Sequence, residues 1–332
     1  MGKKVLVTGV TGQIGHYVAG LLAERGAEVY GLVRQTTNRG AHAVPYTPIS
    51  GDLLDEFSLM SILEKLEPTH IFNFGAQSFI PASWSQPILT AQYTGLGVVR
   101  LLEAVRRVVP SCRVLQAGSS ELFARAKTSP QDETTAISPR NPYGIAKALA
   151  FHTVLAHREH YNLFATNAVF FTNESPRRSP EFLFRKVTRS VAEIVAKRRD
   201  KLVLGNLDTV RDWGFAPEYA EIAVDLLDHD RADDFVVATG EGKRVRDLVQ
   251  IAFSLVGLDW EKHVEIDATL VRPSEPSSLI GNAAKLRETI GRDVQVKFDS
   301  LVRYMLASDL ALEGVAVPFE LPPGRFAKFV TG

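Results

Sequence analysis

The stretch Thr8-Gly9-Val10-Thr11-Gly12-Gln13-Ile14-Gly15 decides the fold class of this chain of 332 residues. It follows the apolar run Val5–Thr8 and opens an amphipathic stretch, Gln13–Arg25, so the glycines lie between a predicted strand and a predicted helix. Glycines at the spacing G-x-x-G-x-x-G allow a tight turn and a close approach of the backbone to a pyrophosphate at the helix N-terminus. A structural turn is the alternative. In this setting we favour a dinucleotide site made by Thr8, Gly9, Gly12, Gln13, Ile14 and Gly15.

Strands and helices alternate through the first half of the chain. The predicted strands are Val5–Thr8, Glu28–Val33, His70–Phe74, Arg113–Ala117 and Phe164–Phe171, and the predicted helices are Gln13–Arg25, Ser58–Leu66, Leu89–Val108 and Pro142–His160. This alternation predicts right-handed crossovers and an α/β fold with a doubly wound parallel sheet, the Rossmann type.

The pattern loosens after about Thr172, where Ser-Pro pairs mark loops. The predicted elements there are helices near Phe182–Arg198, Pro217–Asp228, Val245–Val256 and Ala284–Ile290, and short strands at Leu202–Leu204 and Phe235–Ala238. No linker separates the two halves, so we expect the second half to pack on the sheet as a smaller C-terminal substrate-binding domain.

Composition restricts the class of partner. Lys plus Arg number 38 and Asp plus Glu number 38, so the formal net charge is zero. Nucleic acid and anionic membranes call for a basic excess, and we expect neither as a partner. A single cysteine, Cys112, excludes an intramolecular disulfide and disfavours a thiolate metal site. No targeting or membrane-spanning run stands out, so we expect no metal and a cytoplasmic location.

Two residues after predicted strands bear on the choice of cofactor. The second strand ends in Gly31-Leu32-Val33-Arg34, where NAD-selective sites usually carry an acidic residue; an arginine suits the 2′-phosphate of NADP. We therefore expect NADP, although a solvated basic loop is the alternative reading of Arg34. Asp52, followed by Leu53, ends a predicted third strand, where its carboxylate can accept from an adenine amine or cap a helix. Both readings of Asp52 stay open.

Four side chains form a candidate catalytic set. Ser119 and Glu121 follow the fourth strand, and Tyr143 and Lys147 share one face of a predicted helix at i and i+4. A lysine beside a phenol favours the phenolate by charge, which would let a tyrosine act as a base near neutral pH. The serine hydroxyl can hydrogen-bond the same substrate oxygen. The co-occurrence of these parts with the glycine motif makes the pattern specific.

These residues resemble those of the extended short-chain dehydrogenase/reductase family and, within it, the GDP-mannose 4,6-dehydratases. The resemblance runs from the glycine motif to about Gly291. Its more specific blocks are Ala76-Gln77-Ser78, Ser119-Ser120-Glu121, Pro142-Tyr143-Gly144-Ile145-Ala146-Lys147, Asn173-Glu174-Ser175-Pro176-Arg177-Arg178, Arg185-Lys186-Val187-Thr188, Arg211-Asp212-Trp213-Gly214 and Arg272-Pro273-Ser274-Glu275.

The resemblance implies a cofactor domain at 1–171 and about 208–238, and a nucleotide-sugar domain at about 172–207 and 239–332. It implies catalysis by Ser119, Glu121, Tyr143 and Lys147, further cofactor contacts at Ala76, Ser78 and Arg178, and contacts to the GDP-sugar at Ser78, Ser120, Thr172, Asn173, Lys186, Arg211, Arg272 and Glu275. The implied activity is the NADP-dependent dehydration of a GDP-hexose, GDP-D-mannose first, to the 4-keto-6-deoxy sugar. The alternatives are a 4-keto-6-deoxy-sugar reductase or another epimerase or dehydratase of the family, or a cofactor-binding protein that has lost catalysis.

Three departures from the family pattern stand out. Thr172-Asn173 replaces the family's Asn-His ahead of Glu-Ser-Pro, Arg34-Gln35 replaces an Arg-Arg pair, and Ser119 replaces a threonine. The first puts the placement of the sugar in doubt. The second departure precedes a short loop. In the family this loop reaches the cofactor site of a neighbouring subunit in a tetramer, so we expect here a homodimer or a homotetramer. The third keeps the hydroxyl but loses the β-branch that stiffens χ1.

Overall fold

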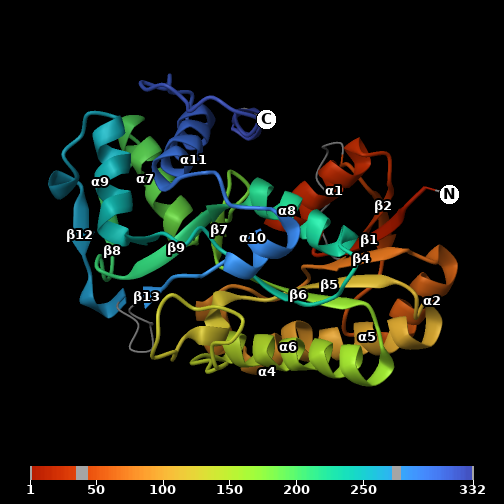
Figure 1. The fold of residues 1–332 in the computed structure, drawn as a ribbon. Coiled ribbons are helices and arrows are strands. Elements are labelled where there is room, and N and C mark those ends of the chain that lie inside the picture. The colour runs from red at the N-terminus through yellow and green to blue at the C-terminus, as the bar shows by residue number, and fades with distance from the viewer. Residues whose placement is uncertain (1, 35–43, 271–277, 331–332) are drawn as a thin grey trace.

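Seven parallel strands form the central sheet, in the order β10-β6-β5-β4-β1-β2-β3 (Figure 1). Their bounds are β1 Lys4–Thr8, β2 Glu28–Val33, β3 Thr47–Ser50, β4 His70–Asn73, β5 Arg113–Ala117, β6 Ala165–Phe170 and β10 Asp234–Val237. This computed structural model describes residues 2–34, 44–270 and 278–330. β1 pairs with β2 on one side and β4 on the other, so the strand order reverses beside β1, where sheets of this kind bind ligands at their carboxyl ends. The predicted doubly wound parallel sheet is confirmed.

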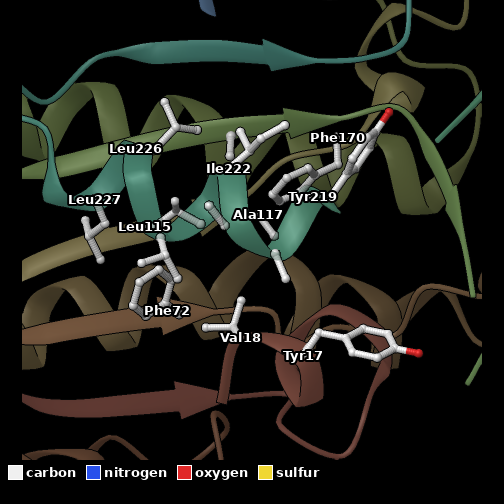
Figure 2. Packing of buried hydrophobic residues seen from close by; sticks show 14 of the residues in the cluster. Tyr17, Val18, Phe72, Leu115, Ala117, Phe170, Tyr219, Ile222, Leu226 and Leu227 are labelled. Carbon is white, nitrogen blue, oxygen red and sulfur yellow. The ribbon is translucent and has the colours of Figure 1, made fainter. Parts of the chain in front are cut away.

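Helices cover both faces of this sheet (Figure 1). On one face lie α1 (Gln13–Glu24) and α8 (Ala216–Asp228), and on the other lie α2 (Glu56–Leu66), α5 (Gly97–Val108) and α6 (Pro142–Tyr161). Figure 2 shows the first interface, where Tyr17 and Val18 of α1 and Tyr219 and Ile222 of α8 gather over the sheet. Because α8 and β10 come from the second half of the chain, that half completes the layers of the sheet as well as building a lobe of its own.

The second lobe surrounds a separate apolar core. Its strands are β7 Thr172–Glu174, β8 Leu202–Leu204, β9 Val210–Phe215, β11 Gly242–Arg244, β12 Val264–Ile266 and β13 Ser278–Leu279, and its helices include α7 Leu183–Val195, α9 Val245–Leu255 and α11 Phe298–Leu312. β9 is central to a small sheet, since it pairs with β7, β11 and β13. In this core Trp213 of β9 stacks on Phe298 of α11, and Phe184 of α7 meets both rings edge-on.

Three features differ from the sequence-based expectations. The sequence patterns do not predict α11, although its apolar residues recur at helical spacing, and they predict no element at β7 or β9. The helix predicted at Leu89–Val108 consists of α4 (Pro87–Thr90), a π-helical segment (Ala91–Leu96) and α5. In the π-helical segment Thr94 Oγ1 accepts a hydrogen bond from the Gln77 N–H at 3.1 Å, which ties the loop after β4 to this helix.

Over the described ranges no helix is long and apolar enough to cross a bilayer.

Candidate active site

One cavity of about 910 Å³ opens at the carboxyl edge of the sheet, between the sheet and the second lobe. Among the residues that line it are Thr8, Gly9, Gly12, Gln13, Ile14, Gly15, Arg34, Asp52, Leu53, Ala76, Ser78, Ser119, Ser120, Glu121, Tyr143, Lys147, Thr172, Asn173, Arg178, Lys186 and Arg211. The fold therefore brings together every site residue that the sequence analysis named within the described ranges. Gln35, Arg272 and Glu275 lie outside the described residues.

The glycine loop is shaped by close approaches of the backbone. Gly9 has φ +63°, and a Cβ there would lie 2.6 Å from the Phe74 carbonyl carbon. A Cβ on Gly15 would lie 2.5 Å from the Gly9 carbonyl oxygen. Gly12 is the N-cap of α1 and supplies no side-chain acceptor, so the N–H groups of the first turn have no side-chain cap. A helix start of this kind suits an anionic group.

The side chain of Gln13 joins the cofactor loop to the second lobe. Its Nε2 donates to the Asn173 Oδ1 at 2.9 Å and to the Asn173 carbonyl oxygen at 3.0 Å, and its Oε1 accepts from the Ser175 hydroxyl at 2.7 Å. The amide of Gln13 is thus engaged by protein at both ends. Its contribution to a ligand site at this helix start rests on its backbone N–H.

Arg34 and Asp52 lie on either side of Tyr93. The Tyr93 hydroxyl donates to Asp52 Oδ2 at 3.0 Å, and the Arg34 guanidinium lies 5.6 Å from the centre of the Tyr93 ring. Asp52 Oδ1 accepts from the Leu54 N–H at 3.0 Å, whereas the N-cap of α2 is Asp55. The helix-cap alternative for Asp52 is therefore wrong, because the neighbouring Asp55 already accepts the N–H of the first turn.

Ser119 and Glu121 are placed by the turn that follows β5. The Ser119 hydroxyl accepts from the Glu121 N–H at 3.3 Å at the start of a 3₁₀ helix, Ser120–Phe123. The Glu121 side chain accepts a hydrogen bond from Asn141 Nδ2 at 2.7 Å, and Glu121 is only 7% exposed. The turn thus holds a carboxylate at the cavity wall beside the serine.

Tyr143 and Lys147 lie in the first turns of α6, and both are buried. Ser119 hydrogen-bonds the Tyr143 side chain, while Lys147 Nζ donates to the Ala117 carbonyl oxygen at 2.6 Å. Burial raises the pKa of Tyr143 to about 12 and lowers the pKa of Lys147 to about 8. The expectation that Lys147 holds the Tyr143 pKa down is wrong for this structure, because burial outweighs the charge and the ammonium bonds a carbonyl instead of the phenol.

A buried acid and an arginine face this pair from the second lobe. Glu174, at the end of β7, is 2% exposed, and burial raises its pKa to about 7. Arg178 Nε lies 3.4 Å from Glu174 Oε2, and its guanidinium lies 3.5 Å from the centre of the Phe182 ring. The charge of Arg178 also acts to lower the pKa of Tyr143.

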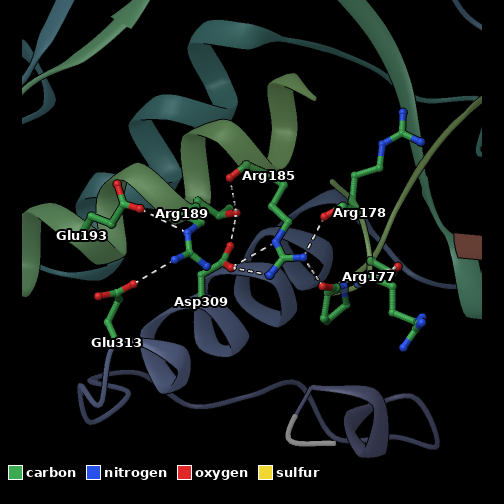
Figure 3. Close-up of polar contacts among 10 residues, drawn as sticks. Arg177, Arg178, Arg185, Arg189, Glu193, Asp309 and Glu313 are labelled. Carbon is green, nitrogen blue, oxygen red and sulfur yellow. Dashed lines mark hydrogen bonds and ion pairs between the residues drawn. The ribbon is translucent and has the colours of Figure 1, made fainter. Parts of the chain in front are cut away.

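The loop that carries Arg178 is held by a neighbouring arginine (Figure 3). Arg185 donates to the carbonyl oxygens of Pro176 and Arg178 and to the Asp309 carboxylate of α11 at 3.1–3.2 Å. Asp309 also accepts from Thr188 at 2.7 Å. Arg185 therefore does not point into the cavity; it fixes the backbone on which Arg178 stands.

The predicted GDP contacts on this side come from α7 and β9. Lys186 Nζ donates to the Val203 carbonyl oxygen at 2.7 Å, and burial lowers the pKa of Lys186. Arg211 Nη1 donates to the Val210 carbonyl oxygen at 2.7 Å. Trp213 is buried between Phe184 and Phe298, as expected for a core residue.

Sequence reasoning missed two residues that organise this site. Tyr93 connects Arg34 to Asp52 from the π-helical segment, and no local pattern marks it. Asn141 bonds Glu121, and its position directly before Pro142 at the start of a predicted helix was a readable capping signal.

The family model described as GDP-mannose 4,6 dehydratase matches residues 6–305. GDP-mannose 4,6 dehydratase of Homo sapiens is 40% identical over 347 aligned residues, which cover 94% of this chain and 93% of that protein. GDP-mannose 4,6 dehydratase 1 of Arabidopsis thaliana is 39% identical over 327 residues, with 93% of this chain and 90% of that protein covered.

Solved structures agree on the fold. UDP-glucose 4-epimerase of Thermotoga maritima, solved with UDP-glucose, has a TM-score of 0.84 at 20% identity and covers 94% of this chain and 99% of that one. RMD from Pseudomonas aeruginosa, complexed with NADPH, has a TM-score of 0.79 at 21% identity, with 93% and 99% covered. The family match over residues 6–305 and the relatives at about two-fifths identity, joined to this fold, show that the chain belongs to the GDP-mannose 4,6-dehydratase family of the extended short-chain dehydrogenases/reductases.

Proposed function

We propose that this protein is a lyase that converts a GDP-hexose, GDP-D-mannose first, to the GDP-4-keto-6-deoxy sugar with loss of one water. One observation carries the proposal: a buried carboxylate, Glu121, lines the same cavity as Ser119, Tyr143 and Lys147. Oxidation and reduction of an alcohol need a hydroxyl-handling group such as Tyr143, whereas elimination of water needs a further acid/base group.

The residues at the sheet edge fit NADP. The uncapped first turn of α1 and the glycine loop suit its pyrophosphate, and Arg34 suits its 2′-phosphate. The other residues proposed to contact the cofactor also line this cavity: Asp52, Leu53, Ala76, Ser78, Tyr143, Lys147 and Arg178. Oxidised NADP supplies a hydride acceptor that later returns the hydride, and it carries a positive charge on the nicotinamide ring.

Tyr143 is the group that takes the proton from the sugar's 4-hydroxyl. Its pKa of about 12 keeps the phenol neutral in this structure, so the base form needs positive charge beside the ring. Arg178 already acts in that direction, whereas Lys147, which is charged at pH 7 with a pKa of about 8, bonds the Ala117 carbonyl oxygen. Ser119 hydrogen-bonds the Tyr143 side chain, which supports its proposed role of bonding the same oxygen of the sugar.

Glu121 performs the elimination. A 4-keto group acidifies the C5 proton, the Glu121 carboxylate accepts that proton, and the same carboxyl then protonates the 6-hydroxyl, which leaves as water. The proton taken from C5 thus departs with the leaving group, and the electron pair of the C5–H bond forms the C5–C6 double bond. Addition of the stored hydride at C6 and of a proton at C5 then gives the 4-keto-6-deoxy sugar, and the proton that Tyr143 took from the 4-hydroxyl balances the proton added at C5. Lys186 and Arg211 supply cations for the GDP pyrophosphate, and Ser78, Ser120, Thr172 and Asn173, which line the cavity, contact the GDP-sugar. The family resemblance assigns Arg272 and Glu275, which lie outside the described residues, to the GDP portion as well.

Glu121→Gln tests the proposal. The substitution is nearly isosteric, so the variant should fold, bind both ligands, oxidise the sugar once and stall with reduced cofactor bound near stoichiometry. Solvent deuterium should not enter C5, and no water should be lost from the sugar. Tyr143→Phe, as the comparison, should give neither reduced cofactor nor exchange. Turnover of the Glu121→Gln variant at the parent rate would remove Glu121 as the elimination base.

The mass of the product separates this function from its rivals. The parent protein is incubated with a panel of nucleotide sugars and catalytic NADP+. Loss of one water marks a dehydratase; a gain of two hydrogens with NADPH marks a reductase; no mass change with turnover marks an epimerase. NADP binding without any turnover would indicate a protein that has lost catalysis.

The choice of NADP over NAD rests on Arg34. We expect the parent protein to bind NADP(H) more tightly than NAD(H), and Arg34→Asp to invert that preference, because the 2′-phosphate then meets a carboxylate. Loss of one charged hydrogen bond costs about 1.5–3 kcal/mol. Equal affinity of the parent for both cofactors, measured by titration, would contradict the assignment.

A homodimer fits an apolar face on α6 and its neighbours. Ile145 and Leu149 of α6 and Ile88 of α4 are exposed, Ile88 to 74%, and Leu149 lies against Gly95 of the π-helical segment, so these helices present one surface. Faces of this kind mark interfaces, and a twofold axis lets the same face pair with itself. Ultracentrifugation should show a dimer that Leu149→Glu dissociates. A tetramer that persists in this variant, or a monomeric parent, would contradict it.

A further inference from the structure

Both ends of one buried amide are used at the start of α6. Asn141 is the N-cap of that helix, and its Oδ1 accepts from the Gly144 N–H at 2.8 Å. Its Nδ2 donates to Glu121 Oε2 at 2.7 Å. Asn141 itself is buried. The amide oxygen of Asn141 therefore caps the helix, and its amide nitrogen binds the Glu121 carboxylate.

The first turn of α6 and the turn that carries Glu121 are packed without space between them. A Cβ on Gly144 would lie 2.9 Å from the Glu121 carbonyl oxygen and 3.1 Å from Pro139 Cβ. The chain just before α6 also donates from the Ser138 N–H to the Leu122 carbonyl oxygen at 2.8 Å. Because the backbones are fixed against each other, the Asn141 side chain links two rigid parts and restrains the torsion of the Glu121 carboxylate.

We propose that Asn141 is a positioning residue that holds the Glu121 carboxylate at a fixed orientation relative to Tyr143, which follows Asn141 by two residues on the same helix end. The elimination step depends on this orientation, because the carboxylate must meet the C5 proton of the very sugar whose 4-hydroxyl Tyr143 contacts. This role rests on the proposed function of Glu121. A donor at this place also favours the ionised carboxylate, which is the form that accepts a proton.

Few side chains can fill both parts of this role. An asparagine amide has an acceptor and donors at its two ends. An aspartate caps a helix equally well but places a second carboxylate 2.7 Å from Glu121. A serine also caps well, but its short side chain reaches less far. Asn141→Asp and Asn141→Ser therefore keep the cap and remove the donor in two different ways.

The first test measures elimination in the complete enzyme with GDP-mannose and NADP+. Asn141→Asp should lower C5 deuterium exchange and kcat at pH 7 by roughly tenfold or more, since two adjacent carboxylates share one proton and the acid limb of the pH profile moves up by at least about one unit. The loss should shrink as the pH is raised to 9. Asn141→Ser should lower both rates at every pH without that recovery, while the single-turnover formation of bound NADPH stays near the parent value.

The matched control is Asp55, which caps α2 away from the cavity by accepting from the Ser58 N–H at 3.0 Å. Asp55→Ser changes only a cap, so it should shift the unfolding midpoint less than Asn141→Ser does and leave kinetics and pH profile unchanged. A parent-like pH profile and parent-like C5 exchange in both Asn141 variants would overturn the positioning role.

A second test does not use activity, so it separates this inference from the proposed function. Thermal unfolding is measured for Asn141→Ser, Glu121→Gln and the double variant. If Asn141 holds the charged carboxylate, the shift of the midpoint caused by Asn141→Ser should be smaller in the Glu121→Gln background at pH 8. Additive shifts would overturn the link between the two side chains even if dehydration of GDP-mannose is observed. A parent without dehydratase activity but with non-additive shifts would refute the function alone.

Discussion

The two walls of the cavity hold their side chains in different ways. The sheet wall, made by Ser119, Glu121, Tyr143 and Lys147, is fastened by partners nearby in the chain: Lys147 bonds Ala117, thirty residues away, and Glu121 bonds Asn141, twenty away. In the lobe wall, made by Thr172, Asn173, Arg178, Lys186 and Arg211, the two cations Lys186 and Arg211 also bond near neighbours, but the segments that carry Asn173 and Arg178 are fastened by distant partners. Arg185, which supports Arg178, bonds Asp309 at a separation of 124 residues, and Asn173 is held by Gln13 at a separation of 160.

This difference indicates that the sheet wall carries out the proton transfers, whereas the lobe wall sets how well the substrate binds. The sheet wall places groups that move protons on one strand end and one helix end, so their mutual geometry survives changes elsewhere. The lobe wall depends on how α7, α11 and the loop between β7 and α7 pack together. We therefore expect substitutions on the sheet wall to affect rate, and substitutions that support the lobe wall to affect stability and substrate affinity.

The largest effect should come from Tyr143→Phe. Loss of a proton-transfer group costs about 10²–10⁴ in rate. Because the change leaves the lobe wall intact, the affinity for GDP, measured by calorimetry, should stay at the parent value. Tyr161→Phe, at the exposed end of the same helix, is the control and should leave both quantities unchanged. A Tyr143→Phe variant that weakens GDP binding as much as it slows turnover would contradict the expectation that the sheet wall sets the rate and the lobe wall sets the affinity.

Asp309→Asn should cause the largest loss of stability on the lobe side. Asp309 is 1% exposed, and the variant leaves the Arg185 guanidinium buried beside a neutral amide. Breaking a buried pair in this way costs about 3–5 kcal/mol of unfolding free energy. Denaturant titration checks it, with Asp208→Asn as the control, because the Arg246–Asp208 pair lies on the surface of the same lobe. Equal losses in the two variants would show that burial adds nothing here.

The buried Glu174 gives the lobe wall a pH dependence. Its pKa of about 7 lies above the ordinary 4.5, so the folded protein keeps this proton longer than the unfolded chain does. The contribution of Glu174 to the stability of the parent should therefore fall as the pH rises from about 4.5 to 7. Glu174→Gln has no proton to lose. The unfolding free energy of the variant minus that of the parent should rise over this window by about 3 kcal/mol and level off above it. A flat difference would contradict the raised pKa.

The smallest effects should come from the cations of the lobe wall. Lys186→Ala and Arg211→Ala should each weaken GDP binding by about 1.5–3 kcal/mol and leave NADP binding unchanged, because each removes one charged contact to a phosphate. Lys201→Ala, an exposed lysine that pairs with Glu265 in the same lobe, is the control. Unchanged GDP affinity in both variants would show that these cations have no role in binding.

The residues of the sheet wall could be predicted from local sequence patterns. The β1 and β5 strands are short apolar runs followed by glycine, and Tyr143 and Lys147 are four residues apart on one helix, so sequence spacing alone placed their side chains on one face. The lobe wall was less readable. β9 carries Arg211 and Trp213 on a strand that sequence patterns did not mark, because its pairing with three other segments, rather than its own propensity, makes it a strand.

The sequence by itself determined the alternation of strands and helices, the glycine turn, and the residues that handle protons, because each of these depends on neighbours within a few turns of chain. Only the tertiary structure decided that Arg185 supports a loop instead of facing the cavity, that Asn141 holds Glu121, and that burial overrides Lys147 in setting the pKa of Tyr143. The physical reason is that burial and charge act through space, so the environment of a side chain depends on segments from 20 to more than 100 residues away along the chain.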